Sequence, residues 1–228
     1  PPQGASGAQD GEVRTGLDQD AALAASRSAV GRAPADYPMR DRANRVVRLS
    51  DYRGKPLLVN FIYSGCFRVC PNSTRALRGA VLAMRDRFGS GQFNVVSIGF
   101  DQPTDSPQSL RSFAAQQRIT DRNWEFLSPR GEDVAALARD FGFSYVATPL
   151  GFDHTLQVSI LDPNGRLRRQ VLGDTFPADS LGEPLKQMIA GRPVADARSW
   201  GDLIGRIRIL CSVYDPVTGK YRTDYGLY

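Results

Sequence analysis

The strongest hydrophobic pattern in the chain is a pair of apolar runs with one amphipathic segment between them. Residues 57–62 are almost continuously apolar, and residues 93–100 form a second such run, which is typical of strands covered on both faces. Between them, apolar side chains recur at helical spacing over 76–88, behind a proline at position 71 that suits a first helical turn. Strand, helix and strand in this order predict a parallel crossover unit.

Shorter segments extend this unit on both sides. By the same criteria we expect helices over 17–30, 106–117, 131–140 and 178–190, strands over 46–49, 124–127, 155–161 and 166–172, and a turn at 162–165. A parallel crossover followed by an antiparallel hairpin and a final helix is the order of elements in a thioredoxin-like domain. The sequence therefore predicts an α/β fold of this type, with a central mixed sheet flanked by helices.

The two ends of the chain differ from the predicted domain. Residues 1–16 carry almost no large apolar side chain and predict a flexible lead. We expect a helix and a linker over 17–45 and the thioredoxin-like domain over 46–191. Residues 192–228 form a C-terminal extension, in which aromatic segments on both sides of a turn at 215–219 predict a small hairpin.

The composition fits one globular domain with extensions. A chain of 228 residues with 41% hydrophobic and 23% charged residues is long enough for a single filled core. The 29 basic and 24 acidic side chains give a net charge of +5 and are dispersed, so we expect no nucleic-acid partner. No stretch approaches the ~18 consecutive apolar residues of a membrane span. The chain begins with proline rather than methionine, so we expect that any targeting segment has been removed.

Two cysteines lie where the first strand of the crossover meets its helix. Cys66 and Cys70 are separated by three residues and flanked by Gly65 and Pro71. The carboxyl end of a parallel strand is where open α/β sheets place their sites. Because the positive end of a helix favours an anion, we expect a lowered pKa for Cys70, and the same field could act on Cys66. A thiolate serves reversible disulfide formation and metal binding equally well, so both chemistries stay open at this point.

A single histidine adds a third candidate ligand. Three residues between two sulfurs leave a wider bite than the usual dithiol arrangement, which can close a disulfide or span one ion. His154 is the one histidine of the chain, and alone it would be taken as a surface or packing residue. In a thioredoxin-like order, however, it faces the cysteine loop. Two thiolates and an imidazole suit Cu(I), and with an oxygen ligand also Cu(II), whereas a structural zinc site requires a fourth protein ligand.

Two aspartates are candidates for a supporting role behind these ligands. Asp101 follows the second strand and either orients His154 or belongs to the start of the next helix, where Asp105 or Ser106 would be the capping residue. For Asp105 we favour capping, and for Asp101 both interpretations stay open. Asp153 precedes His154 directly and is the second supporting candidate.

The third cysteine, Cys211, lies in the extension. Three cysteines are too few for a disulfide scaffold and do not match a four-thiolate zinc or iron–sulfur site. Cys211 is an inert buried residue, an unbridged thiol, or a disulfide partner of Cys66, Cys70 or another chain. We favour the inert interpretation.

Taken together, these segments resemble the Sco/SenC copper proteins that assist the assembly of cytochrome c oxidase. The resemblance covers about residues 46–190 and rests on residues 49–56, Cys66, Cys70 with Pro71, Asp101 with 105–107, residues 124–127, 153–155 and 161–165. It implies that Cys66, Cys70 and His154 are the ligands of one copper ion, as Cu(I), Cu(II) or both. It also implies that the protein delivers copper to the dinuclear copper centre of oxidase subunit II, or reduces the thiols of that centre.

The resemblance also implies a location and further partners. Such proteins are membrane-tethered, so we expect the periplasmic side of the bacterial inner membrane, together with a copper donor protein or a thioredoxin-like reductant. The extension resembles an ending found in some bacterial members, where a membrane anchor follows. Residues 67–69 between the cysteines, Phe-Arg-Val, depart from the family's Pro-Asp/Glu-Val pattern, which bears on affinity and partner choice.

Other functions compete with a copper chaperone. The main alternative is a thiol-disulfide oxidoreductase, in which one of Cys66 and Cys70 attacks a partner disulfide and the other resolves it. A peroxiredoxin-like peroxidase would share the fold, but no threonine stands three residues before a single reactive cysteine. A redox or copper sensor would bind its partner through the aromatic hairpin expected at 211–225.

Overall fold

The computed structural model describes residues 16–66, 69–149, 151–194 and 210–211. The helices are α1 (Gln19–Ala29), α2 (Val69–Phe88), α3 (Pro107–Gln116), α4 (Val134–Asp140) and α5 (Ala178–Ile189), with short 3-10 turns at Leu49–Tyr52 and Gly131–Asp133. The strands are β1 (Met39–Arg40), β2 (Val46–Val47), β3 (Leu57–Ile62), β4 (Asn94–Gly99), β5 (Trp124–Pro129), β6 (Tyr145–Thr148), β7 (Gly151–Thr155), β8 (Gln157–Leu161), β9 (Leu167–Leu172) and β10 (Leu210–Cys211).

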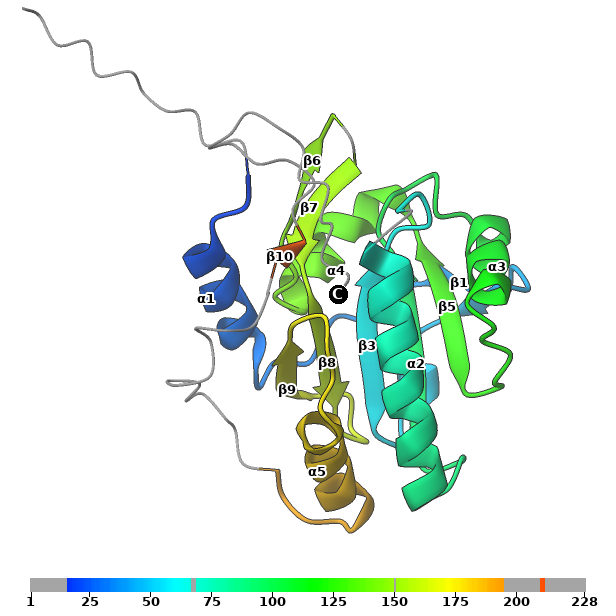
Figure 1. Cartoon of the computed structure of the whole chain (residues 1–228), viewed down its shortest axis with the longest axis vertical. Helices are drawn as coiled ribbons and strands as arrows, with labels where there is room; N and C mark the ends of the chain where they lie inside the picture. The colour runs from blue at the N-terminus through cyan, green and yellow to red at the C-terminus, as the bar shows by residue number, and fades with distance from the viewer. Residues whose placement is uncertain (1–15, 67–68, 150, 195–209, 212–228) are drawn as a thin grey trace, which may run out of the picture.

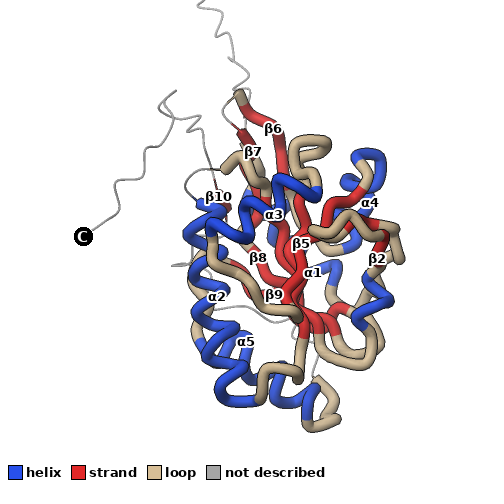
Figure 2. The backbone as a smooth tube through the Cα atoms, turned by 90° about the vertical axis from the view of Figure 1, so that its right-hand side faces the viewer, coloured by secondary structure: helices blue, strands red, loops and turns tan. Residues whose placement is uncertain are grey.

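A seven-stranded mixed sheet forms the centre of the molecule, in the order β2-β1-β5-β4-β3-β8-β9 (Figure 1). Strands β3, β4 and β5 are parallel, whereas β8 runs antiparallel to β3 and pairs with β9 as a hairpin. Helices α2 and α5 cover one face of this sheet, and α1 and α4 cover the other (Figure 2). The predicted α/β, thioredoxin-like architecture is therefore confirmed.

Buried polar side chains join the three central strands. The indole Nε1 of Trp124 on β5 donates to Ser97 Oγ on β4 at 3.0 Å, and that hydroxyl donates to Asn60 Oδ1 on β3 at 2.7 Å. Trp124 and Ser97 are fully buried, so each polar group needs its partner. These two hydrogen bonds add side-chain links between β3, β4 and β5, whose backbones already pair in parallel.

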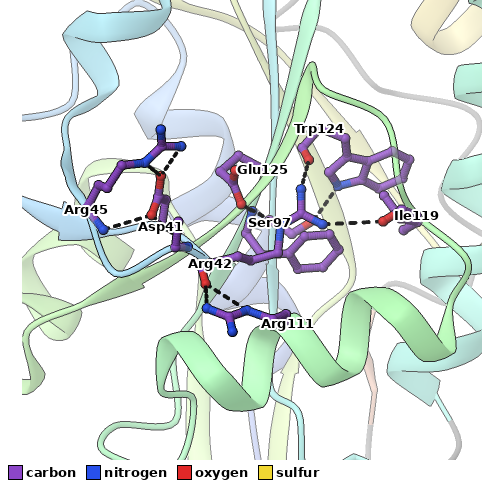
Figure 3. Close-up of polar contacts among 10 residues, drawn as sticks. Asp41, Arg42, Arg45, Ser97, Arg111, Ile119, Trp124 and Glu125 are labelled. Carbon is purple, nitrogen blue, oxygen red and sulfur yellow. Dashed lines mark hydrogen bonds and ion pairs between the residues drawn. The ribbon is translucent and has the colours of Figure 1, made fainter.

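The segment expected to be a linker contributes β1, which lies between β2 and β5. Arg42, just after β1, donates from Nε to Glu125 Oε1 at 2.6 Å and from Nη2 to the Trp124 carbonyl at 2.9 Å (Figure 3). Its guanidinium also lies over the ring of Phe126, 5.4 Å from the centroid. Because that side chain is only 20% exposed, these contacts fasten residues 39–47 to the edge of the sheet.

A second sheet of three strands, in the order β10-β7-β6, was not predicted. The sequence placed His154 just before a strand starting at 155, whereas His154 lies inside β7 and the next strand, β8, starts at Gln157. Residues 1–15 of the lead expected at 1–16, and the hairpin expected at 211–225 apart from Cys211, fall outside the described residues. Within the part of the chain that is described, none of the helices combines the length and apolarity needed to cross a bilayer.

Candidate metal centre

The two cysteines lie where β3 leads into α2, with Cys66 before the helix and Cys70 in its first turn. The Cys66 N–H donates to the Tyr63 carbonyl at 3.2 Å, and the Cys70 N–H donates back to Cys66 Sγ at 3.3 Å. The second bond is what a helix entrance provides, because the first N–H groups of a helix have no partner within it. Cys66 is 8% exposed and Cys70 1% exposed. Both are thiols, and they lie together at the carboxyl end of β3.

The expected lowering of the Cys70 pKa is wrong, since the pKa of this thiol is raised well above its usual value. The hydrogen bond with Cys66 contributes most, followed by burial and the charge of Cys66. Helix α2 begins at Val69, so Cys70 already lies inside its first turn with the sulfur out of contact with water. Desolvation and a neighbouring thiolate here outweigh the field of the helix. Cys70 therefore holds its proton until something replaces it.

His154 approaches the cysteines from β7 with a defined ring orientation. Its Nδ1 lies 3.0 Å from the Thr155 carbonyl oxygen, and because a carbonyl can only accept, Nδ1 is the protonated nitrogen. The lone pair of a neutral ring is then on Nε2, which lies 4.0 Å from Cys70 Sγ. Burial lowers the pKa of His154, against a smaller opposing effect of the Thr155 bond. The ring is therefore neutral at physiological pH and presents a bare nitrogen to the thiols.

Aromatic side chains surround the imidazole. Its ring centroid lies 5.9 Å from that of Tyr63, 5.6 Å from Phe100 and 5.8 Å from Phe143. Burial and the neighbouring Cys66 raise the pKa of Tyr63, which keeps its hydroxyl protonated beside the sulfurs. The hydrophobic pattern of the sequence did not predict this aromatic enclosure. Tyr63 stands three residues before Cys66, directly after a buried strand, and that position was the available signal.

The buried carboxylate of Asp105 supports the cysteine loop through hydrogen bonds. Asp105 Oδ1 accepts from the Ser64 N–H at 2.7 Å and from Ser64 Oγ at 2.6 Å, and Oδ2 accepts from the Asp101 N–H at 2.9 Å. The capping role favoured for Asp105 is wrong, because Ser106 caps α3 by accepting from the Ser109 N–H. Burial raises the pKa of Asp105 despite these bonds. The carboxylate thus links the ends of β3 and β4 behind the site.

The two predicted supporting aspartates lie differently. Asp101 is held through its backbone by Asp105, at the end of β4 beside the cysteine loop. Asp153 is fully buried on β7 next to His154, and successive residues of a strand point to opposite faces, so its carboxylate and the imidazole lie on different sides of β7. A role for either in orienting a ligand stays a prediction.

Sulfur and imidazole nitrogen are donor atoms that suit a soft metal ion. The protein brings Cys70 and His154 near each other without such an ion. Among the described residues, no three His, Cys, Asp or Glu side chains already lie within common bonding distance of one point. The 4.0 Å between Cys70 Sγ and His154 Nε2 is nevertheless suitable, since metal–sulfur and metal–nitrogen bonds of about 2.3 and 2.1 Å, as in zinc sites, span at most about 4.4 Å. The charge of Cys66 also acts on the imidazole of His154, so all three side chains lie in the same region of the molecule.

These features define the protein as a thioredoxin-like domain with two buried thiols and a neutral histidine at one end of its sheet. Residues 26–190, well over half of the chain, match the family model described as SCO1/SenC. The chain therefore belongs to the SCO1/SenC family, and the resemblance noted in the sequence is confirmed.

Individual relatives are distant in sequence and close in fold. The SCO1 protein homolog of Bacillus subtilis is 23% identical over 155 residues, which cover 66% of this chain and 79% of that protein. The crystal structure of Arabidopsis thaliana ScoI with copper bound superposes with a TM-score of 0.61 at 18% identity, over 70% of this chain and 99% of that one. Bradyrhizobium japonicum ScoI with copper bound gives a TM-score of 0.57 at 22% identity, over 68% and 98%.

Proposed function

We propose that this protein is a copper chaperone of the Sco type, which binds one copper ion through Cys66, Cys70 and His154. The observation that carries the proposal is the position of His154 Nε2, 4.0 Å from Cys70 Sγ, with its lone pair directed at the buried thiols. Thiolate is a ligand that selects Cu(I), and imidazole is a ligand that suits copper. The copper-bound state of two structural relatives supports the same conclusion.

The residues around the ion have separate tasks in this mechanism. The copper ion supplies the positive charge that replaces the thiol protons. Because the pKa of Cys70 is raised, uptake releases a proton at neutral pH and becomes tighter as the pH rises. His154 needs no deprotonation, since its ring is neutral and its Nδ1 keeps its proton, which it donates in the hydrogen bond to the Thr155 carbonyl. The rings of Tyr63 and Phe100 exclude water that would otherwise compete for the ion.

The proposed acceptor is the dinuclear copper centre of cytochrome c oxidase subunit II, or a similar copper site. This follows from membership of the SCO1/SenC family together with the soft, buried donor set. The proposed location is the periplasmic side of the bacterial inner membrane, where a membrane-tethered domain would meet both a copper donor protein and the oxidase.

A copper competition experiment tests the ligand set. Purified protein and the variants Cys66→Ser, Cys70→Ser and His154→Ala compete with a chromophoric Cu(I) chelator, and Cu(II) is titrated separately. Each cysteine variant should lose Cu(I) affinity by roughly 100-fold or more, and His154→Ala should weaken Cu(II) most. Arg130→Ala, an exposed ion-pair residue, is the control and should match the wild type. Unchanged affinity of His154→Ala for both valences would exclude the proposed site.

A second function is favoured by one observation, the contact between the Cys70 N–H and Cys66 Sγ. In a thiol-disulfide exchange, one thiolate attacks a partner disulfide to form a mixed disulfide. The other then displaces the partner, so two electrons and two protons pass to the partner and a Cys66–Cys70 disulfide remains. The raised pKa of Cys70 makes Cys66 the attacking thiol. Such turnover requires both cysteines and proceeds without His154, which separates it from copper binding.

A further inference from the structure

The short strand β10 places a third cysteine against the strand of the proposed histidine ligand. β10 pairs antiparallel with β7, with Leu210 opposite Thr155 and Cys211 opposite His154. Directly opposed residues of an antiparallel pair project to the same face, with Cβ atoms about 4.5–5.5 Å apart. Cys211 therefore lies on the same side of the three-stranded sheet as the imidazole, whereas Leu210 lies on the other side.

Two further observations place Cys211 in the same buried region as the other thiols. The side chain is only 2% exposed. Its charge is among the groups that raise the pKa of Cys70, which locates the two sulfurs within electrostatic range in a poorly solvated environment. The chain has three cysteines and one histidine, and all four come from separate positions in the sequence to this one end of the molecule.

We propose that Cys211 is a third sulfur ligand of the copper site, so that Cu(I) is bound by Cys66, Cys70, Cys211 and His154. This inference rests on the proposed copper function and adds a ligand from the C-terminal segment. A third soft thiolate strengthens binding of Cu(I) much more than binding of Cu(II), which prefers nitrogen and oxygen. Cys211 would therefore determine which valence the protein retains, while the other three residues determine whether copper binds at all.

The strand pairing gives this ligand a structural origin. A sulfur at position 211 reaches the site only while β10 is paired with β7, because the register fixes which residue stands opposite His154. A shift by one residue would turn the cysteine to the opposite face and bring Leu210 to the site. The pairing of the C-terminal segment and the composition of the donor set are thus coupled.

Copper-edge X-ray absorption on the Cu(I)-loaded full chain tests the assignment directly by counting sulfur ligands. We expect three sulfurs for the wild type and two for Cys211→Ser. In competition with a chromophoric chelator, Cys211→Ser should lose roughly tenfold or more of its Cu(I) affinity and change its Cu(II) affinity by less than about threefold. Leu210→Ala disturbs the same strand without removing a sulfur, and it should keep the wild-type sulfur count.

The possible outcomes distinguish a failure of the third sulfur ligand from a failure of the proposed copper function. An unchanged sulfur count and Cu(I) affinity in Cys211→Ser, with losses in the Cys66, Cys70 and His154 variants, would overturn the third sulfur ligand and leave the proposed function standing. A wild-type protein that retained no Cu(I) would overturn both. Thermal melting of Cys211→Ser and Cys211→Ala without metal shows whether a loss reflects unfolding. Melting at the wild-type temperature together with a lost sulfur supports the assignment.

Discussion

The seven-stranded and three-stranded sheets differ in how deeply their residues are buried and in what they contribute to the molecule. Every residue of β3 is buried, and so is β8, whereas two of the four residues of β6 are exposed. The large sheet buries long apolar runs between layers of helices (Figure 2). The small sheet contributes few apolar residues of its own and presents His154 to the cysteine loop. Stability is therefore concentrated in the first sheet, and the geometry of the candidate site depends on the second.

The largest effect should come from removing the indole at the centre of the large sheet. Trp124→Ala deletes a fully buried side chain and leaves Ser97 without its donor, so we expect a loss of about 3–5 kcal/mol in the free energy of unfolding. Chemical denaturation measures this. Phe152→Ala, which removes a partly buried ring from β7, should cost less. If Phe152→Ala cost as much as Trp124→Ala, stability would not be concentrated in the large sheet.

A smaller effect is expected at the joint between the sheet and the site. Asp105→Ala leaves the partly buried N–H groups of Ser64 and Asp101 without this acceptor, which costs about 1–3 kcal/mol and loosens the segment that carries Cys66. Ser106→Ala is the matched control, because it removes the cap of α3, worth about 1 kcal/mol, without touching Ser64. Denaturation and copper competition are measured on both. Equal copper affinities of the two variants would contradict a supporting role for Asp105.

A glycine in the small sheet should affect the site more than it affects stability. Gly151 has a φ of +133°, and an added Cβ would lie 2.8 Å from the Tyr63 hydroxyl oxygen. Gly151→Ala should cost about 1–2 kcal/mol through backbone strain and displace the ring that covers His154. Gly79→Ala in α2 meets nothing within 4 Å, so this control should stabilise the helix by about 0.5–1 kcal/mol. Wild-type copper affinity in Gly151→Ala would show that Tyr63 does not shape the site.

The smallest effect should be a pH dependence from the site itself. In the metal-free protein, burial holds the pKa of His154 below the 6.5 that it has when unfolded. The unfolded chain therefore binds the extra proton first, and stability falls as the pH is lowered below about 6.5, by at most about 1.4 kcal/mol per pH unit. His154→Phe keeps the aromatic packing and removes this proton. Denaturation from pH 7.5 to 5 should show a shallower fall in the variant, and parallel curves would contradict a neutral buried ring.

The same contrast explains what could be predicted from the sequence. The apolar runs that form β3 and β4 are almost continuous, and together with the helical spacing between them they predicted the crossover and the fold. Strands β6 and β7 alternate weakly and include Asp153 and His154 at buried positions, which a hydrophobic pattern does not mark. The spacing of Cys66 and Cys70 located the site. The pKa of Cys70 was predicted in the wrong direction because it depends on burial and on a second sulfur, and neither is visible before the chain folds.

The hydrogen bond from His154 Nδ1 to the Thr155 carbonyl has a consequence for how variants of this protein can be made. The partner is a main-chain atom of the adjacent residue, so no side-chain replacement at a second position can delete it. Substitutions around the site can change its size, polarity and accessibility without changing the orientation of His154 Nε2. The orientation of the His154 ring is set by the backbone conformation. The site is therefore a suitable starting point for designing other metal specificities.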